Sequence, residues 1–100
     1  MAVPRGQVLT EVRAAVDQSR HDALMEGFEA LLAEPLPDGL LRTELLFGGG
    51  QWRVQTLWRD RGALAAMRSS AGEPAAPTLF RSVGAEPHLT ILDVRGSTEA

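Results

Sequence analysis

The sequence predicts an α+β protein in which helices cover one side of an antiparallel sheet. Four segments alternate between apolar and polar residues, which is the period of a β-strand. Two intervening segments place apolar residues at helical spacing instead. Three glycines, residues 48–50, separate the second and third alternating segments and permit the tight reversal of a hairpin.

The first strand is expected over residues 7–16, where two sets of residues alternate. One set is Val8, Thr10 and Val12, and the other is Leu9, Glu11 and Arg13. A helix of about four turns follows, with Ser19 as its predicted N-cap. It ends near Glu34, because Pro35 and Pro37 cannot continue it. Its apolar stripe consists of Leu24, Phe28, Leu31 and Leu32.

The second and third strands are expected over residues 39–47 and 51–59, joined by the glycine turn. The third strand carries Trp52 and Trp58 on one face. Asp60 is a natural N-cap for a second helix that runs to about Ser70. The inner side of this helix is predicted to hold Ala63, Leu64 and Met67.

The remainder of the chain is expected to contain one more strand. Residues 71–77 have the composition of a flexible loop, and residues 78–83 could form a short helical turn. The final strand is predicted over residues 88–95, followed by a polar tail from about residue 96. The order of elements is therefore the ferredoxin-like βαββαβ arrangement, in a single domain that covers residues 1–100.

The apolar residues of the strands define the face that the helices are expected to cover. This face holds Val8, Thr10, Val12, Leu41, Thr43, Leu45, Val54, Thr56 and Trp58, with Thr90 and Leu92 if the last strand keeps step. The opposite face holds Glu11, Arg13, Arg42, Glu44, Arg53 and Gln55, interspersed with Leu9, Leu40 and Leu57. Leucines among charges of both signs favour a homodimer packed through this face, although a solvated face would look the same.

Composition excludes several classes of function. A net charge of −3, with arginines spread along the chain, argues against nucleic-acid binding. No apolar run is long enough to span a membrane, and the first residues lack the apolar core of a signal peptide, so a cytoplasmic location is expected. The sequence has no cysteine, lysine, tyrosine or asparagine, which excludes thiolate and Schiff-base chemistry. Its two histidines lie far apart, so neither a metal site nor a bound cofactor is expected.

Two short motifs resemble the antibiotic biosynthesis monooxygenase-like families of the dimeric α+β barrel superfamily. They are PDGLL at residues 37–41 and, above all, LWRDRGAL at residues 57–64, and the resemblance extends over nearly the whole chain. It implies a pocket between helices and sheet on the Trp58 side, and homodimerisation by packing of the sheets. Members with known activity include cofactor-free oxygenases that oxidise polyketide phenols to quinones, and relatives that degrade heme.

The resemblance transfers few functional residues. In the quinone-forming oxygenases an asparagine lies four residues before the tryptophan and a tyrosine six residues after it, where this chain has Val54 and Leu64. Trp58 itself carries over, and Arg81 is a candidate for a later arginine of the family. The axial histidine and the asparagine of the heme-degrading relatives have no counterpart.

Individual residues also have structural interpretations. Trp58 is first of all a core residue, and Trp52 is expected to be more exposed near the hairpin. His21 is expected in a solvated first helical turn. His88 is a candidate base, because the last strand borders the pocket in this fold.

The leading hypothesis is a monooxygenase-like oxidoreductase that acts on or binds a flat aromatic or polyketide-like molecule without a cofactor. Its candidate catalytic residues are Trp58, His88 and Arg81, and its candidate substrate-binding residues are Thr10, Thr43, Val54, Thr56, Leu64 and Met67. The alternative is a non-catalytic module of the same fold that binds a small hydrophobic ligand or a partner.

Overall fold

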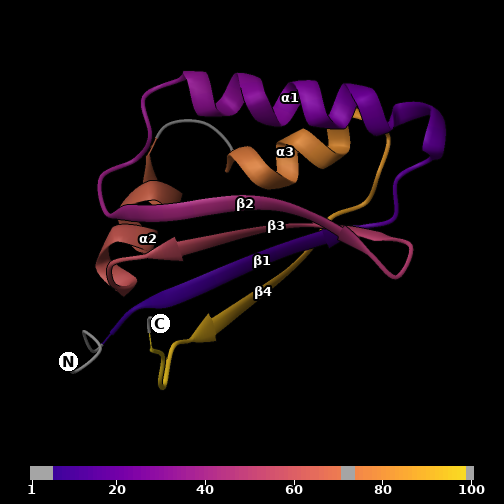
Figure 1. Cartoon of the computed structure of the whole chain (residues 1–100). Helices are drawn as coiled ribbons and strands as arrows, with labels where there is room; N and C mark the ends of the chain where they lie inside the picture. The colour runs from indigo at the N-terminus through magenta and orange to yellow at the C-terminus, as the bar shows by residue number, and fades with distance from the viewer. Residues whose placement is uncertain (1–5, 71–73, 99–100) are drawn as a thin grey trace.

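The structure is a computed structural model that describes residues 6–70 and 74–98. Its sheet has the strand order β2-β3-β1-β4, and each pair of neighbours is antiparallel. Figure 1 shows α1 and α3 on one side of the sheet and α2 at one end of it. The elements are β1 (Val8–Ala14), a 3₁₀ turn (Gln18–Arg20), α1 (His21–Ala33), β2 (Leu40–Gly48), β3 (Gln51–Trp58), α2 (Arg61–Ser69), α3 (Ala75–Ser82) and β4 (His88–Asp93). The predicted ferredoxin-like βαββαβ fold is confirmed.

The segment before the last strand contains more helix than the sequence predicts. Helix α3 begins at Ala75, inside the segment predicted as a loop, and residues 71–73 of that segment lie outside the described residues. Pro74 is the N-cap and Pro77 lies in the first turn, where a missing N–H costs no hydrogen bond. Helix α3 also lies close to α1, because a methyl group added to Gly27 would come within 2.6 Å of the Leu79 side chain.

The start of the first helical segment differs from the prediction by two residues. Asp17, rather than Ser19, accepts the capping hydrogen bonds, from the Ser19 N–H at 2.9 Å and from the Ser19 hydroxyl at 2.6 Å. The 3₁₀ turn begins directly after Asp17, and α1 follows the turn without a break. Ser19 itself lies inside the first turn. Its N–H and hydroxyl therefore donate to the Asp17 carboxylate, and Ser19 is not the cap.

Two details of the sheet change which residues face the helices. A β-bulge between Leu40 and Arg42 shifts the alternation of β2, so Leu40 pairs with Trp58 and packs in the core while Leu41 is half exposed. The prediction had exchanged these two leucines. In β4, Ile91 pairs with Thr10, so Leu89 and Ile91 lie on the helix side. The expectation that Thr90 and Leu92 would do so is wrong.

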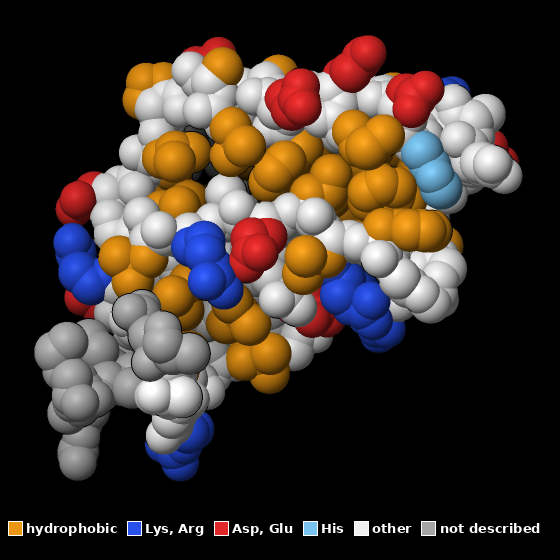
Figure 2. All heavy atoms as spheres, in the orientation of Figure 1, with side chains coloured by type: hydrophobic (Ala, Val, Ile, Leu, Met, Phe, Trp, Pro, Cys, Tyr) orange, Lys and Arg blue, Asp and Glu red, His pale blue; other side chains and the backbone are white. Residues whose placement is uncertain are grey.

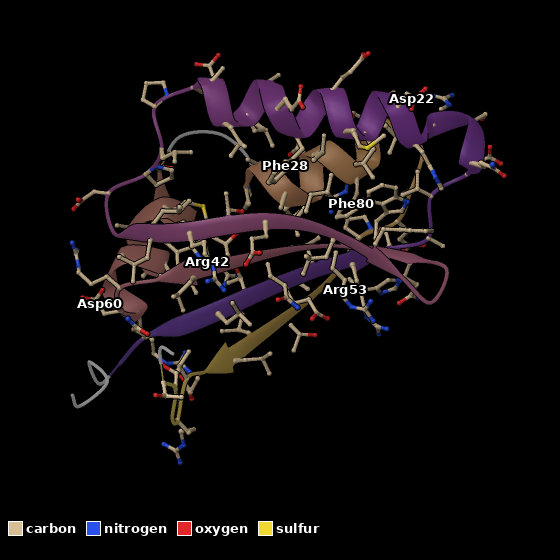
Figure 3. The ribbon with its side chains drawn as sticks, in the orientation of Figure 1. Asp22, Phe28, Arg42, Arg53, Asp60 and Phe80 are labelled. Carbon is tan, nitrogen blue, oxygen red and sulfur yellow. The ribbon has the colours of Figure 1, made fainter. Side chains whose placement is uncertain are left out.

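The core has two parts along the covered face. One cluster includes Trp52, Leu24 and Phe80, and the other includes Trp58, Val8 and Leu64. Trp52 is 7% exposed, so the prediction of an exposed position near the hairpin is wrong. Figure 3 shows Phe28 and Phe80 between α1 and the sheet. The two tryptophans therefore anchor opposite ends of the same strand.

The sheet face opposite the helices carries the charges that the sequence placed there. Glu11 accepts a hydrogen bond from Gln55 at 3.0 Å and lies 3.6 Å from Arg53. Arg42 and Glu44 form an ion pair at 2.9 Å.

Within the described residues, no helix is long and apolar enough to cross a membrane.

Asp60 caps α2 as predicted, and this cap makes stability depend on pH. Its carboxylate accepts a hydrogen bond from the Ala63 N–H at 2.7 Å, which holds the pKa of Asp60 below its ordinary value. Because the folded state favours the ionised carboxylate, its stabilising effect is complete above the unfolded-state pKa of 3.8 and is lost as the pH falls through the lower folded-state pKa.

An Asp60→Asn variant keeps a capping oxygen but cannot titrate. We expect the free energy of unfolding of the wild type to fall more steeply below about pH 4 than that of the variant. Urea unfolding followed by tryptophan fluorescence across an acid pH series measures both curves. Asp17, whose pKa is also lowered, titrates in both proteins and does not affect the comparison. Parallel curves would contradict this role of the cap.

Candidate functional site

A cavity of about 300 Å³ lies between the helices and the sheet. Its floor is formed by β1, β3, β2 and β4, and its far walls by the C-terminal part of α1, residues 35–37, α2 and the start of α3. The lining is overwhelmingly apolar, with Phe28, Leu31 and Leu32 contributed by α1. Figure 2 shows hydrophobic side chains gathered between α1 and the edge strand β2. Such a space suits a neutral ligand with a hydrophobic body.

The polar groups on the floor form a short hydrogen-bonded chain across three strands. The indole N–H of Trp58 donates to the Thr10 hydroxyl at 3.1 Å. Thr10 in turn donates to the Thr56 carbonyl oxygen over 3.5 Å, which is long for a hydroxyl bond. The hydroxyl oxygens of Thr43 and Thr56 lie 2.9 Å apart. The Trp58 N–H thus already has an acceptor inside the protein.

Two ionisable residues, Glu34 and Arg68, stand among the described residues that line the cavity. Both side chains are exposed, because they lie at the end of α1 and the end of α2. The floor itself is built from hydroxyl, indole and hydrocarbon groups. A bound molecule would therefore meet dipoles on the floor and charges at the rim.

The structure brings Trp58 and all the predicted substrate-binding residues together around this cavity. These are Thr10, Thr43, Val54, Thr56, Leu64 and Met67. Alternation on the strands and helical spacing on α2 explain why the sequence placed them on one side. Their part in binding stays a prediction.

His88 and Arg81 do not line the cavity. His88 pairs with Arg13 on the opposite face of the sheet and is exposed, so its expected position beside the pocket is wrong. The register of β4 gives the cavity side to Leu89 and Ile91. Arg81 is exposed in the last turn of α3 and lies outside the cavity lining. Neither position supports direct contact with a ligand in the cavity.

His21 lies at the other end of the sheet, away from the cavity, in an aromatic cluster. Its ring contacts Phe47 and Trp52 edge-on, with centroids 5.5 and 5.0 Å away. Its Nε2 lies 3.0 Å from the Val16 carbonyl oxygen, which fixes this nitrogen as the donor. The expected solvated position of His21 is therefore wrong, because the N-terminal end of α1 packs against the hairpin.

Several lining residues were not among the predicted site residues. They include the stripe of α1, the segment 35–37, the start of α3 and the two apolar residues of β4, together with Val12, Glu34, Leu40 and Arg68. The helical stripe at residues 28, 31 and 32 is visible in the sequence, but periodicity does not show that it lines a cavity as well as packing against the core. Residues 74–77 belong to the segment whose composition predicts a loop, so the sequence does not reveal their contribution to the cavity.

Comparison with solved structures agrees with this architecture. A candidate antibiotic biosynthesis monooxygenase from Deinococcus radiodurans superposes with a TM-score of 0.73 at 13% identity, over 93% of this chain and 97% of that one. Rv0793 from Mycobacterium tuberculosis gives 0.70 at 21% identity, over 94% and 100%. SnoaB, a cofactor-independent oxygenase from Streptomyces nogalater, gives 0.63 at 17% identity, over 92% and 96%.

The chain shares its fold with these three proteins. The resemblance inferred from residues 37–41 and 57–64 is thereby confirmed at the level of the fold. No protein-family model matches the sequence, and no curated protein is significantly similar to it. At identities of 13 to 21%, these comparisons establish the fold of the chain. The reaction has to be inferred from the chemistry of the cavity.

Proposed function

We propose that the protein binds an electron-rich aromatic small molecule in the cavity and oxygenates it without a cofactor. The observation that carries this proposal is the apolar cavity of about 300 Å³ with Trp58 and three threonine hydroxyls on its floor. The fold shared with SnoaB, a cofactor-independent oxygenase, supports the type of reaction. A flat ring would be held between the sheet and α1 and shielded from water.

The reaction can be balanced with molecular oxygen as the oxidant. With anthrone as the substrate, the ring CH₂ group loses two hydrogens and gains one oxygen atom, and the second oxygen atom leaves as water. All four electrons come from the substrate. The described lining places no ionisable side chain on the floor, so the acidic proton of the substrate passes to solvent. The rate should then follow the ionisation of the substrate as the pH rises.

Oxygen uptake with a panel of anthrones and naphthols tests this proposal. We expect oxygen uptake above the buffer rate for at least one planar substrate. The quinone should be formed, and one O₂ molecule should be consumed for each quinone. A Leu31→Trp variant, which fills the apolar wall with a larger side chain, should remove the activity. Uptake at the buffer rate across the whole panel would contradict the oxygenase proposal.

A specific observation also favours a second candidate, a non-catalytic binding protein. The Trp58 N–H is engaged by Thr10, and Val54 and Leu64 supply hydrocarbon to the lining. These contacts suit the binding of a ligand better than the polarisation of its reacting groups. Tight binding of an aromatic ligand without oxygen consumption would select this function over oxygenation.

We propose further that two copies pack through the sheet face that bears Glu11, Arg13, Arg42, Glu44, Arg53 and Gln55. Leu46 and Leu92 lie on this face and are 38% and 43% exposed. Half-buried Leu9 and Leu57 pair on the two central strands of this face, in a row with Leu92 and Arg42. A matching face would cover these leucines and supply partners for the arginines.

A Leu57→Glu variant is expected to convert this dimer to a monomer, because it places a charge within the apolar contact made by Leu9, Leu57 and Leu92. Analytical ultracentrifugation at micromolar concentration measures the change. Met25→Glu is the matched control, since Met25 is 42% exposed on α1 and lies on the other side of the sheet. A wild-type protein that sediments as a monomer, or a Leu57 variant that remains a dimer, would contradict the interface.

A further inference from the structure

The Thr43 and Thr56 hydroxyls leave one proton without an acceptor. Their oxygens lie 2.9 Å apart, and either one can donate to the other. Each hydroxyl has a single proton, so one proton occupies the bond between them and the other points elsewhere. Within the described part of the chain, neither hydroxyl has a second hydrogen-bond partner. Both residues line the cavity, where the second proton can reach a bound molecule.

The other polar side chains on the floor each have an acceptor within the protein, at 3.1 Å for Trp58 and at a long 3.5 Å for Thr10. The Trp58 N–H donates to Thr10, and the Thr10 hydroxyl points its proton at the Thr56 carbonyl oxygen. The donor that has no acceptor within the described part of the protein therefore lies where β2 and β3 pair through Thr43 and Thr56. This place is defined by a cross-strand pair on a rigid sheet, which fixes where a ligand oxygen would lie.

We propose that the Thr43–Thr56 pair anchors one carbonyl oxygen of a neutral, otherwise apolar ligand. This inference rests on the proposed function, because it assumes that the cavity binds a ligand. A carbonyl oxygen accepts the free proton whichever threonine supplies it, since the two hydroxyls are adjacent. A carboxylate would fit less well, because the charges of the lining residues stand at the rim and the floor offers a single neutral donor.

The shared proton predicts an unusual pattern among variants. In Thr43→Val, Thr56 keeps its own proton and can donate it to the ligand. In Thr56→Val, Thr43 can do the same. Only the double variant Thr43→Val/Thr56→Val removes the donor. Each single variant should therefore keep the preference for a carbonyl, and the double variant should lose it.

Fluorene and 9-fluorenone provide a matched pair of ligands, because they differ by a CH₂ group in place of a carbonyl. Equilibrium dialysis measures the affinity of each compound for the whole protein. We expect the wild type and both single variants to prefer fluorenone by about fivefold, as one neutral hydrogen bond allows. The double variant should lose the preference for fluorenone, because the buried carbonyl is left without a donor, and it should still bind fluorene. A Thr43→Ser/Thr56→Ser variant should restore the preference, and thermal unfolding of each variant checks that it is folded.

The outcomes separate this inference from the proposed function. If the wild type binds neither compound, the proposed binding function is wrong and the anchor falls with it. If the wild type binds both equally, or if the double variant still prefers fluorenone, the cavity binds ligands but the anchor is wrong. Loss of the preference in one single variant would overturn the shared donor.

Discussion

Replacing Gly39 with alanine is expected to lower the free energy of unfolding by about 2–4 kcal/mol. Gly39 has a φ of +84° in the turn that leads into β2, where an L side chain is strained. A methyl group at this position would also collide with the Cβ of Ala63 in α2. The backbone strain accounts for about 1 kcal/mol, and the collision with the buried Ala63 side chain accounts for the remainder.

Gly49→Ala separates these two effects. Gly49 also has a positive φ, of +60°, but an added methyl group would lie in open space. We expect this control to lose only about 1 kcal/mol. Urea unfolding measures both variants. Equal losses would show that α2 does not need the close approach at Gly39.

The Gly39 variant also has a functional consequence. The collision would displace α2 from the sheet, and α2 supplies Leu64 and Met67 to the cavity. Ligand affinity should therefore fall in Gly39→Ala and remain unchanged in Gly49→Ala. A turn residue that does not itself line the cavity would thus control the shape of the site.

Replacing Trp58 with alanine is expected to cost about 3–5 kcal/mol of stability, because it empties a large volume between β3 and α2. Trp58 is 3% exposed and packs in the cluster with Val8, Ala63 and Leu64. For a domain of this size such a loss lowers the melting temperature by at least about 12 °C. Thermal unfolding measures the change directly.

Indole should partly restore the Trp58→Ala variant, because it replaces the missing ring at the edge of the apolar cavity. The melting temperature should rise with indole concentration and level off as the site saturates. Trp58→Phe is the control, since phenylalanine fills most of the space and leaves less room for indole. A Trp58→Ala variant that loses less than about 1 kcal/mol would contradict the packing role of this residue.

Much of the site could be predicted because it depends on local periodicity. Alternation along the strands placed Thr10, Val54 and Thr56 on the same face as Trp58, and helical spacing placed Leu64 and Met67 toward them. Aspartate is a strongly preferred N-cap residue, so Asp60 predicts the start of α2 correctly. These inferences need only neighbours in sequence, and the structure places all these residues as expected.

The incorrect placements have a common origin in long-range contacts. The position of His88 depended on the register between β4 and β1, and a shift of one residue exchanges the two faces of a strand. The exchange of Leu40 and Leu41 came from a bulge in β2 that local alternation does not reveal. Trp52 is buried and His21 half-buried beside it, because the start of α1 closes over the hairpin end.

The sequence by itself determined the order of elements, the hairpin at the glycines and the strand that presents Trp58 ahead of α2. Backbone propensities and side-chain periodicity act between residues that are close along the chain, so they can be recognised without a structure. Tertiary structure alone decided that the Trp58 N–H is engaged by Thr10 and that the Thr43 and Thr56 hydroxyls meet. Those contacts join strands 13 to 48 residues apart, and they exist only once the register of the sheet is set.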